Sequence, residues 1–314
     1  MPKTGNILME FDKAGAEWVV VAYASGDPRM IEVIQSGKSP HLITGCLISG
    51  ASEDLVLKED KLVGKNTDPG LIEDLRREGC PEIFDDPTIK FFPRSMSIRQ
   101  CGKKSNHGLN YIMGQREFSL FSELDEATCR TVIKLYTTEA YVYVPIWWES
   151  VKRELKDNGR TITNCFGDKR RFLDRWDNQL FKAAVAFLPQ STVARCVHKG
   201  LRQTWNDNHP SVGLYNPLAN VHDSLLFQAA VNGQWKTLAQ GALRIAEYMS
   251  PLCVYSGREF KIATDLKVGL NWGEYSNDNT RGMMSVKLTR DIDKLAKDLK
   301  SAWEHLNGGH SKAA

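Results

Sequence analysis

Two aspartates stand in short apolar segments whose residues favour β-strands. Asp12 ends the run 7–11, and Asp223 lies within the run 221–227. Burying an unpaired carboxylate is costly unless a cation or hydrogen-bond donors compensate it. Two such strands side by side would supply carboxylates able to hold two Mg²⁺ about 3.5–4 Å apart, which stabilises both oxygens of an in-line phosphoryl displacement. A turn or helix-capping role for either aspartate stays open, because spacing alone cannot pair residues so distant in the chain.

The other segments predict an α+β fold in which helices surround a small sheet. Residues 7–12 predict a strand, and residues 218–228 predict a pair of strands. The segment 45–92 contains clusters of Gly, Pro and Asp and predicts loops with short helices. Helices are expected over 17–25, 28–34, 95–113, 140–156, 179–202 and 234–249.

The last part of the chain carries an apolar stripe at helical spacing. Its members recur at intervals of 4, 3, 4, 3 and 4 residues in an otherwise charged segment, which is typical of one face of a helix. Such a stripe needs a partner surface. The partner is either the rest of this chain or a second chain, and the sequence leaves both open. The apolar stripe consists of Leu288, Ile292, Leu295, Leu299, Ala302 and Leu306.

The composition is that of a globular protein. Of the 314 residues, 42% are hydrophobic and 25% are charged, which excludes global disorder and rod-like folds. The apolar run 18–24 has seven residues, far fewer than the about 20 that a membrane-spanning helix requires. The seven cysteines form no Cys-x-x-Cys pair, which disfavours a disulfide framework or a zinc site and indicates a reducing cytoplasm.

Positive charge gathers in two stretches of the sequence. The net charge is only 41 − 38 = +3. Residues 90–116 contain six Lys or Arg and no acidic residue, and residues 152–202 contain twelve basic and five acidic residues. Segregation of this kind is typical of a surface that binds a polyanion such as nucleic acid. A solvated basic surface is the alternative for either stretch taken alone.

The segment 99–111 places cations and an aromatic ring on one predicted helix face. Six of its side chains span roughly 140° of the helix circumference. Arg99 and Lys103 can neutralise a polyphosphate, and the ring of Tyr111 can stack on a base. A solvated amphipathic helix remains the alternative for this segment. The six residues are Arg99, Lys103, Asn106, His107, Asn110 and Tyr111.

Taken in order, these three groups of residues resemble the motifs of family A DNA polymerases, the DNA polymerase I class. Asp12 followed five residues later by Glu17 is similar to the first motif of that family. The pattern R-x₃-K-x₃-H-G-x₂-Y at 99–111 is similar to the second motif, and His-Asp at 222–223 is similar to the third. Further matches lie at 25–28, 37–41, 166–171, 190 and 265–272, so the resemblance covers about residues 5–274.

The resemblance implies part of a right-hand polymerase, with a small antiparallel palm sheet and a helical fingers subdomain but without thumb or exonuclease. The implied boundaries are a first palm segment at 1–30, fingers at 31–175 and a second palm segment at 176–274. The remaining 275–314 would form a C-terminal amphipathic helical tail.

The resemblance also implies an activity, the addition of dNTPs to the primer end of primer-template DNA with two Mg²⁺, or Mn²⁺. Asp12, Asp223 and the backbone carbonyl of Lys13 would bind the metals. Lys103 would also protonate the leaving pyrophosphate, and Glu17 would exclude a ribose 2′-hydroxyl. The nucleotide-binding set is Arg99, Lys103, His107, Tyr111, Glu17 and His41, and the DNA-contacting set is Gln190, His222, Lys182, Arg170 and Arg171.

Some positions depart from the family pattern. His107 replaces a Phe or Tyr, which keeps a ring but adds a titratable nitrogen, so sugar discrimination stays open. Ser224 replaces a Glu, which leaves two aspartates to bind metal. Departures of this kind would weaken the contacts that the family makes to the minor groove of DNA, so altered fidelity is expected. The remaining departures are Val19, Lys182, Ala186 and Ile112.

Family members carry a thumb and a first palm segment before the first motif, whereas here Asp12 lies close to Met1. We therefore expect a fragment, or one half of a split phage-type polymerase in a host cytoplasm, with the thumb supplied by a second chain. The apolar stripe is the candidate docking element for that chain.

Two other functions remain open from the sequence. A relative of single-subunit RNA polymerases would share the two metal-binding aspartates, but Glu17 argues against it because that class keeps a small residue there. A non-catalytic, polymerase-derived protein that binds DNA or assembles with other chains would keep its role without Asp12 and Asp223.

Overall fold

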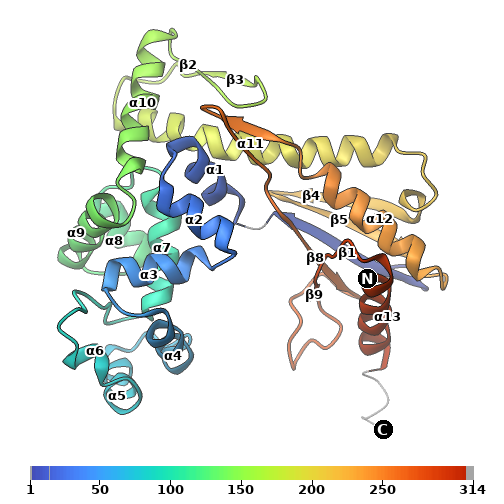
Figure 1. Cartoon of the computed structure of the whole chain (residues 1–314), viewed down its shortest axis with the longest axis horizontal. Coiled ribbons are helices and arrows are strands. Elements are labelled where there is room, and N and C mark those ends of the chain that lie inside the picture. The colour runs from blue at the N-terminus through green and yellow to red at the C-terminus, as the bar shows by residue number, and fades with distance from the viewer. Residues whose placement is uncertain (1, 14, 309–314) are drawn as a thin grey trace. The chain divides into compact units, whose positions relative to one another are not determined.

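The structure is a computed structural model and describes residues 2–13 and 15–308 (Figure 1). By its internal contacts the chain divides into two compact units. The first unit comprises Met1–Ala16 and Gln190–Ala314, and the second comprises Glu17–Pro189. The names palm and fingers, and the boundaries at 30, 175 and 274, stay predictions.

A five-stranded antiparallel sheet forms the centre of the first unit. The strands β1 (Asn6–Lys13), β4 (Tyr215–Val221), β5 (Ser224–Ala230), β8 (Thr264–Gly269) and β9 (Met284–Val286) follow the order β4-β5-β1-β8-β9. Because β1 alternates, Ile7, Met9 and Phe11 enter one core while Glu10 and Asp12 point to the other face. The predicted mixture of many helices with a small antiparallel sheet is confirmed.

Two helices cover the apolar face of this sheet. These are α12 (Trp235–Tyr248) and α13 (Ile292–Gly308), and both lie beside the strands in Figure 1. Their buried side chains share one core with β1, β5 and β8. The unit also contains the short 3₁₀ helix η2 (Val212–Leu214), the ribbon of β6 (Cys253–Tyr255) and β7 (Arg258–Phe260), and the last part of α11 (Asn178–Asn206) from Gln190 on.

The apolar stripe belongs to this core, so the prediction that it docks a second chain is wrong. Leu295, Leu299 and Leu306 are at most 2% exposed and pack in the cluster around the sheet. The predicted tail at 275–314 also contains β9, which extends the sheet, and its residues 309–314 lie outside the described part of the chain.

Shortening Leu299 to alanine is expected to destabilise the first unit by about 2–5 kcal/mol, because it leaves a cavity among buried side chains. Chemical denaturation measures the change. Lys297→Ala on the exposed face of the same helix is the control and should change stability by less than about 0.5 kcal/mol. Equal, small effects of both substitutions would contradict the observed packing.

The second unit is mainly helical. Side chains that accept hydrogen bonds from the first turn begin several of its helices, among them Asp27, Ser39, Ser52, Asp68 and Ser97. The helices are α1 (Ala16–Ser25), α2 (Pro28–Ser36), α3 (Pro40–Ser49), α4 (Glu53–Val63), α5 (Pro69–Gly79), α6 (Glu82–Asp85), α7 (Ile98–Leu109), α8 (Gln115–Ser122), α9 (Glu126–Leu135), the π-helix η1 (Tyr136–Ala140) and α10 (Tyr143–Asp157). The strands β2 (Thr161–Thr163) and β3 (Lys169–Arg171) form a hairpin, and the first part of α11, up to Pro189, follows.

Two differences from the expected helices concern this unit. The segment 45–92, expected as loops with short helices, contains more helix than expected, because the short helices α3, α4, α5 and α6 occupy most of it. The helix expected over 179–202 is longer, because α11 extends to Asn206 and continues through Pro189. Among the residues that the structure describes, no helix combines the length and the apolar character that crossing a membrane demands.

Candidate functional site

Asp12 and Asp223 meet at one end of the sheet in the first unit. Asp12 on β1 pairs with Ser224 on β5, so Asp223 immediately precedes its cross-strand neighbour. Because Val221 pairs with Ser224, residues 222–223 form the two-residue turn of a β-hairpin. His222 adopts a φ of 52° there, a conformation rare for residues other than glycine. The pairing of β1 with β5 therefore places Asp12, on a strand, beside Asp223, in the turn.

The electrostatics of Asp12 reflect this arrangement. Burial, and next the negative charge of Asp223, raise the pKa of the Asp12 carboxyl from 3.8 to about 6. The ammonium of Lys267 and the backbone N–H of Lys13, which donates to Oδ1 at 3.0 Å, offset part of this rise. Negative charge at this point is therefore only partly compensated by the protein.

The donor set at these two carboxylates fits a hard divalent cation. Carboxylate oxygens suit Mg²⁺ and Mn²⁺, and Mg²⁺ is usually bound by one or two carboxylates together with substrate phosphates. Across residues 2–13 and 15–308 no group of three or more His, Cys, Asp or Glu residues is arranged to hold a metal ion. A cation here would thus be bound by Asp12, Asp223 and oxygens of the backbone, of water or of substrate phosphates.

The sequence predicted a role for the backbone carbonyl of Lys13 but none for its side chain. Its ammonium is buried and donates to Ser250 Oγ at 3.1 Å, to the Ile262 carbonyl at 3.0 Å and to Thr264 Oγ1 at 2.9 Å. Burial lowers the pKa of this ammonium to about 8. These bonds fix the end of β1 directly after Asp12. The sequence signal was a lysine at the end of an apolar strand.

Asp12→Asn is expected to stabilise the metal-free protein at neutral pH. The carboxyl has a higher pKa in the folded chain than in the unfolded chain, so the folded state gains stability below pH 3.8 and loses it as the pH rises through about 6. Because the group is only half-buried, the gain from the substitution should be about 1 kcal/mol above pH 7 and should vanish below pH 4.

Urea denaturation at several pH values without divalent cations measures this difference. Asp278→Asn, at an exposed position of the same unit, is the matched control and should show no such pH dependence. A destabilised Asp12→Asn at pH 7 would show that the carboxylate is compensated in the free protein.

In the second unit, α7 carries the basic residues that the sequence singled out. Ser97 begins the helix by accepting from the Gln100 N–H, and the helix ends at Leu109, so Tyr111 lies beyond it. Lys103 and His107 are exposed, and Arg99 is partly exposed.

The six side chains at 99–111, predicted to lie within one arc of a helix, do not form one surface. Asn106 and Asn110 point into the unit, because buried partners satisfy their amides there. Asn106 Oδ1 accepts from Thr44 Oγ1 at 2.9 Å, and Asn110 Oδ1 accepts from Tyr136 Oη at 2.8 Å. These bonds fasten α7 to α3 and η1.

Helix α3 lies directly behind α7. A Cβ on Gly102 would stand 2.4 Å from the His41 carbonyl oxygen and 2.6 Å from Gly45 N, so only glycine permits this approach. The His41 ring lies 5.6 Å from the His107 ring, and His41 Nδ1 is 3.2 Å from Asn106 Nδ2.

Both histidines are held in the neutral form at pH 7. Burial, followed by the charges of His107 and Lys103, lowers the pKa of His41 to about 4. Partial burial of its ring, and next the positive charge of Lys103, also lower the pKa of His107 although part of its side chain is open to solvent. Bound anionic oxygens would raise both pKa values, because a nearby negative charge favours imidazolium.

Glu17 and Tyr111 contact one another within the second unit. The Tyr111 hydroxyl donates to Glu17 Oε2. Burial, and next the charge of Glu17, raise the pKa of this hydroxyl, so Tyr111 remains a donor. The Trp148 indole N–H donates to the Asn110 carbonyl at 3.0 Å and fixes the chain just before Tyr111. The first turn of α1 is thereby tied to the segment after α7.

The residues expected to contact DNA are spread over both units. Gln190 and His222 are exposed in the first unit. In the second unit, Lys182 donates to Glu117, and Arg170 and Arg171 are exposed on β3 with the Arg170 guanidinium 4.7 Å from the centre of the Phe172 ring. Their DNA contacts stay predictions.

The chain resembles solved DNA polymerase structures. No protein-family model and no curated protein matches it in sequence. The polymerase domain of Pol1 from M. smegmatis, in complex with DNA primer-template and dNTP, aligns with 85% of the chain at a TM-score of 0.60 and 17% identity. The chain has a DNA polymerase-like fold. It spans 40% of the length of that Pol1 chain.

The comparison corrects one expectation. The similar structure supports a polymerase-like fold, but not a split phage-type polymerase with a second chain. At this level of identity the likeness concerns the fold, so the roles of individual residues stay proposals.

Proposed function

We propose that this chain is a template-directed DNA polymerase, which adds deoxynucleotides to a primer 3′ end by phosphoryl transfer. The observation that carries the proposal is the proximity of Asp12, at the end of β1, to Asp223, in the turn just before β5, within a polymerase-like fold. Burial and the charge of Asp223 raise the pKa of the Asp12 carboxyl. A lone catalytic acid or a structural turn would not require a second carboxylate beside the half-buried Asp12.

Asp12 and Asp223 are proposed to hold two Mg²⁺, with the Lys13 carbonyl as a further ligand. Bound there, the cations would neutralise the charge that develops on the attacking and leaving oxygens. Lys13 keeps the Asp12 backbone in place through the three hydrogen bonds of its buried ammonium. Its side chain therefore orients the carboxylate and needs no contact with the substrate.

The exposed side of α7 is proposed to bind the triphosphate. Arg99 offers a planar guanidinium, and Lys103 offers a mobile ammonium that can protonate the leaving pyrophosphate. Neutral His41 and His107 can donate ring N–H groups to phosphate oxygens and gain a proton as those oxygens arrive.

The Glu17–Tyr111 pair is proposed to select the sugar and to lie against the nascent base pair. The hydrogen bond supports this role because it holds a carboxylate and a ring rigidly together. The proposed DNA contacts are Gln190, His222, Lys182, Arg170 and Arg171.

Single-nucleotide extension of a labelled primer-template tests the proposal, because one turnover does not require processive synthesis. The full chain with Mg²⁺ is expected to add the dNTP complementary to the template base, and EDTA should abolish the addition. Extension with NTPs in preference to dNTPs would favour an RNA polymerase. Binding of DNA without extension, under Mg²⁺ and under Mn²⁺, would overturn the proposal.

A further inference from the structure

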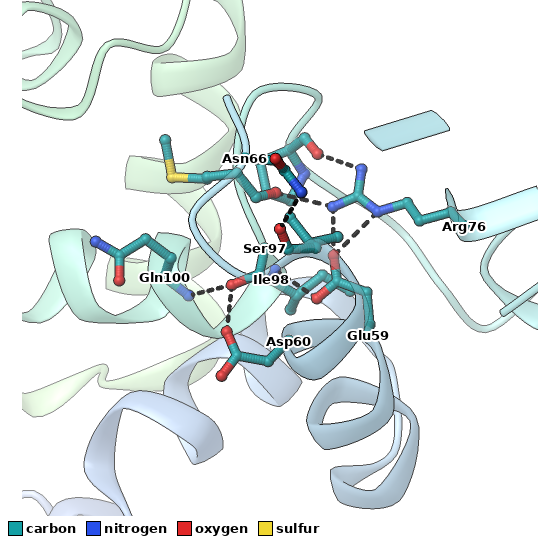
Figure 2. A network of polar contacts seen from close by, with 10 residues as sticks. Glu59, Asp60, Asn66, Arg76, Ser97, Ile98 and Gln100 are labelled. Atoms are coloured by element: carbon teal, nitrogen blue, oxygen red, sulfur yellow. Dashed lines mark hydrogen bonds and ion pairs between the residues drawn. The ribbon is translucent and has the colours of Figure 1, made fainter. Parts of the chain in front are cut away.

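A buried ion pair joins α4 to α5 in the second unit. Glu59 Oε1 accepts from Arg76 Nε at 3.0 Å and from Nη2 at 2.5 Å, and both side chains are at most 2% exposed. Arg76 also donates to the carbonyls of Pro93 and Met96 at 2.6 and 2.9 Å. Figure 2 shows that these contacts gather around the chain that leads into α7. The α4–α5 pair therefore fixes the approach to the proposed triphosphate-binding helix.

Two consecutive acidic residues of α4 then bind the N-terminus of α7. Glu59 Oε2 accepts from the Ile98 N–H at 2.9 Å, and Asp60 Oδ1 accepts from Ser97 Oγ at 2.5 Å (Figure 2). Carboxylates at this end of a helix are favourable because its free N–H groups carry partial positive charge. Both carboxylate oxygens of Glu59 therefore have partners, Oε1 in Arg76 and Oε2 in the Ile98 N–H.

Asp60 has a second contact that Glu59 lacks. Its Oδ2 lies 3.4 Å from Arg99 Nη1, and both side chains are partly open to solvent. This is a single, long contact on one nitrogen of a guanidinium that can donate five hydrogen bonds. The Arg99 guanidinium thus contacts Asp60 on one side and is open to solvent elsewhere, where a nucleotide could reach it.

We propose that Asp60 is a positioning residue that holds Arg99 in the free protein and gives it up to the triphosphate of a bound nucleotide. The inference deepens the proposed function and rests on it. A carboxylate beside an incoming triphosphate repels it, so the pair sets the nucleotide affinity as well as the resting orientation of Arg99. Ser97 keeps Asp60 in place after the exchange.

The exchange can be tested with inorganic triphosphate. Isothermal titration calorimetry at low ionic strength measures its affinity for the full chain. Asp60→Asn keeps an acceptor for Ser97 but removes the charge, and it is expected to tighten binding about fivefold, the scale of one partly exposed ion pair. Asp60→Glu keeps the charge and should bind like the unaltered chain. Asp54→Asn, exposed on the same helix, is the control for net charge and should change little.

A double-mutant cycle with Arg99→Met separates the possible outcomes. In the Arg99→Met background, Asp60→Asn should tighten binding less than it does in the unaltered chain, because the competition for Arg99 is gone and only the direct repulsion by Asp60 remains. Equal tightening in both backgrounds would overturn the exchange. If Arg99→Met weakens binding but Asp60→Asn has no effect in either background, the inference fails and the proposed function stands. If Arg99→Met leaves binding unchanged, the assignment of α7 to the triphosphate fails first. Melting curves of each variant exclude unfolding as the cause.

Discussion

Asp12→Asn and Asp223→Asn are each expected to lower the rate of template-directed nucleotide incorporation by on the order of 10³-fold, the scale on which losing one strong electrostatic group slows an enzyme. The reason is that neither carboxylate alone supplies enough negative charge beside substrate phosphates to hold the cations. Rapid-quench kinetics of a single addition measures the change, and DNA affinity should remain within about threefold because other residues contact the duplex.

The stability of the same variants provides the control. Asp12→Asn is expected to fold at least as stably as the unaltered chain at neutral pH, so a loss of activity cannot be assigned to unfolding. Asp278→Asn, on the surface of the same unit, should retain full activity. Near-normal incorporation by both Asn variants would remove the basis of the proposed chemistry.

Arg76→Met is expected to lower the free energy of unfolding of the second unit by about 3–5 kcal/mol, because it leaves the Glu59 carboxylate buried without its partner. Burial already raises the pKa of Glu59 while Arg76 lowers it, so removal of Arg76 should raise this pKa further. The penalty should therefore shrink at acidic pH, where Glu59 takes up a proton. Chemical denaturation at neutral and acidic pH measures both effects.

The adjacent arginine is a matched control. Arg77 pairs with Glu73 at 2.6 Å on the exposed side of the same helix, and Arg77→Met should cost less than about 1 kcal/mol. The double variant Glu59→Gln, Arg76→Met should recover part of the loss, because no buried charge remains. A cost for Arg76→Met no larger than that for Arg77→Met would contradict the buried network.

Local patterns were sufficient to predict the elements around Asp12 and Asp223. The apolar run 7–11 predicted the strand β1, and the segment 218–228 predicted a pair of strands, because both signals come from neighbours in the sequence. The position of Asp223 in the turn, which the sequence had left open, comes from the structure. The pairing of the two strands was reached only through the family resemblance, since no rule of spacing links Asp12 to Asp223. The observed register of β1 with β5 supplies that link.

The inward Asn106 and the Glu59–Arg76 pair could not be predicted from the sequence. Asn106 is turned inward by Thr44, and periodicity alone cannot reveal a buried polar partner. Glu59 and Arg76 lie in charged segments that resemble solvated helices, and only the packing of α4 against α5 and α7 buries them. The apolar stripe on α13 likewise gave no sign of its partner, which proved to be the sheet.

Direct titration of Mn²⁺ into the full chain with a dNTP, followed by electron paramagnetic resonance, tests the central claim that these two carboxylates hold catalytic cations. We expect tight Mn²⁺ binding that weakens at least tenfold in Asp12→Asn and in Asp223→Asn, and that also weakens as the pH falls below about 6, where Asp12 is protonated. Asp278→Asn should bind like the unaltered chain. Mn²⁺ binding that is the same in all four proteins would contradict the account.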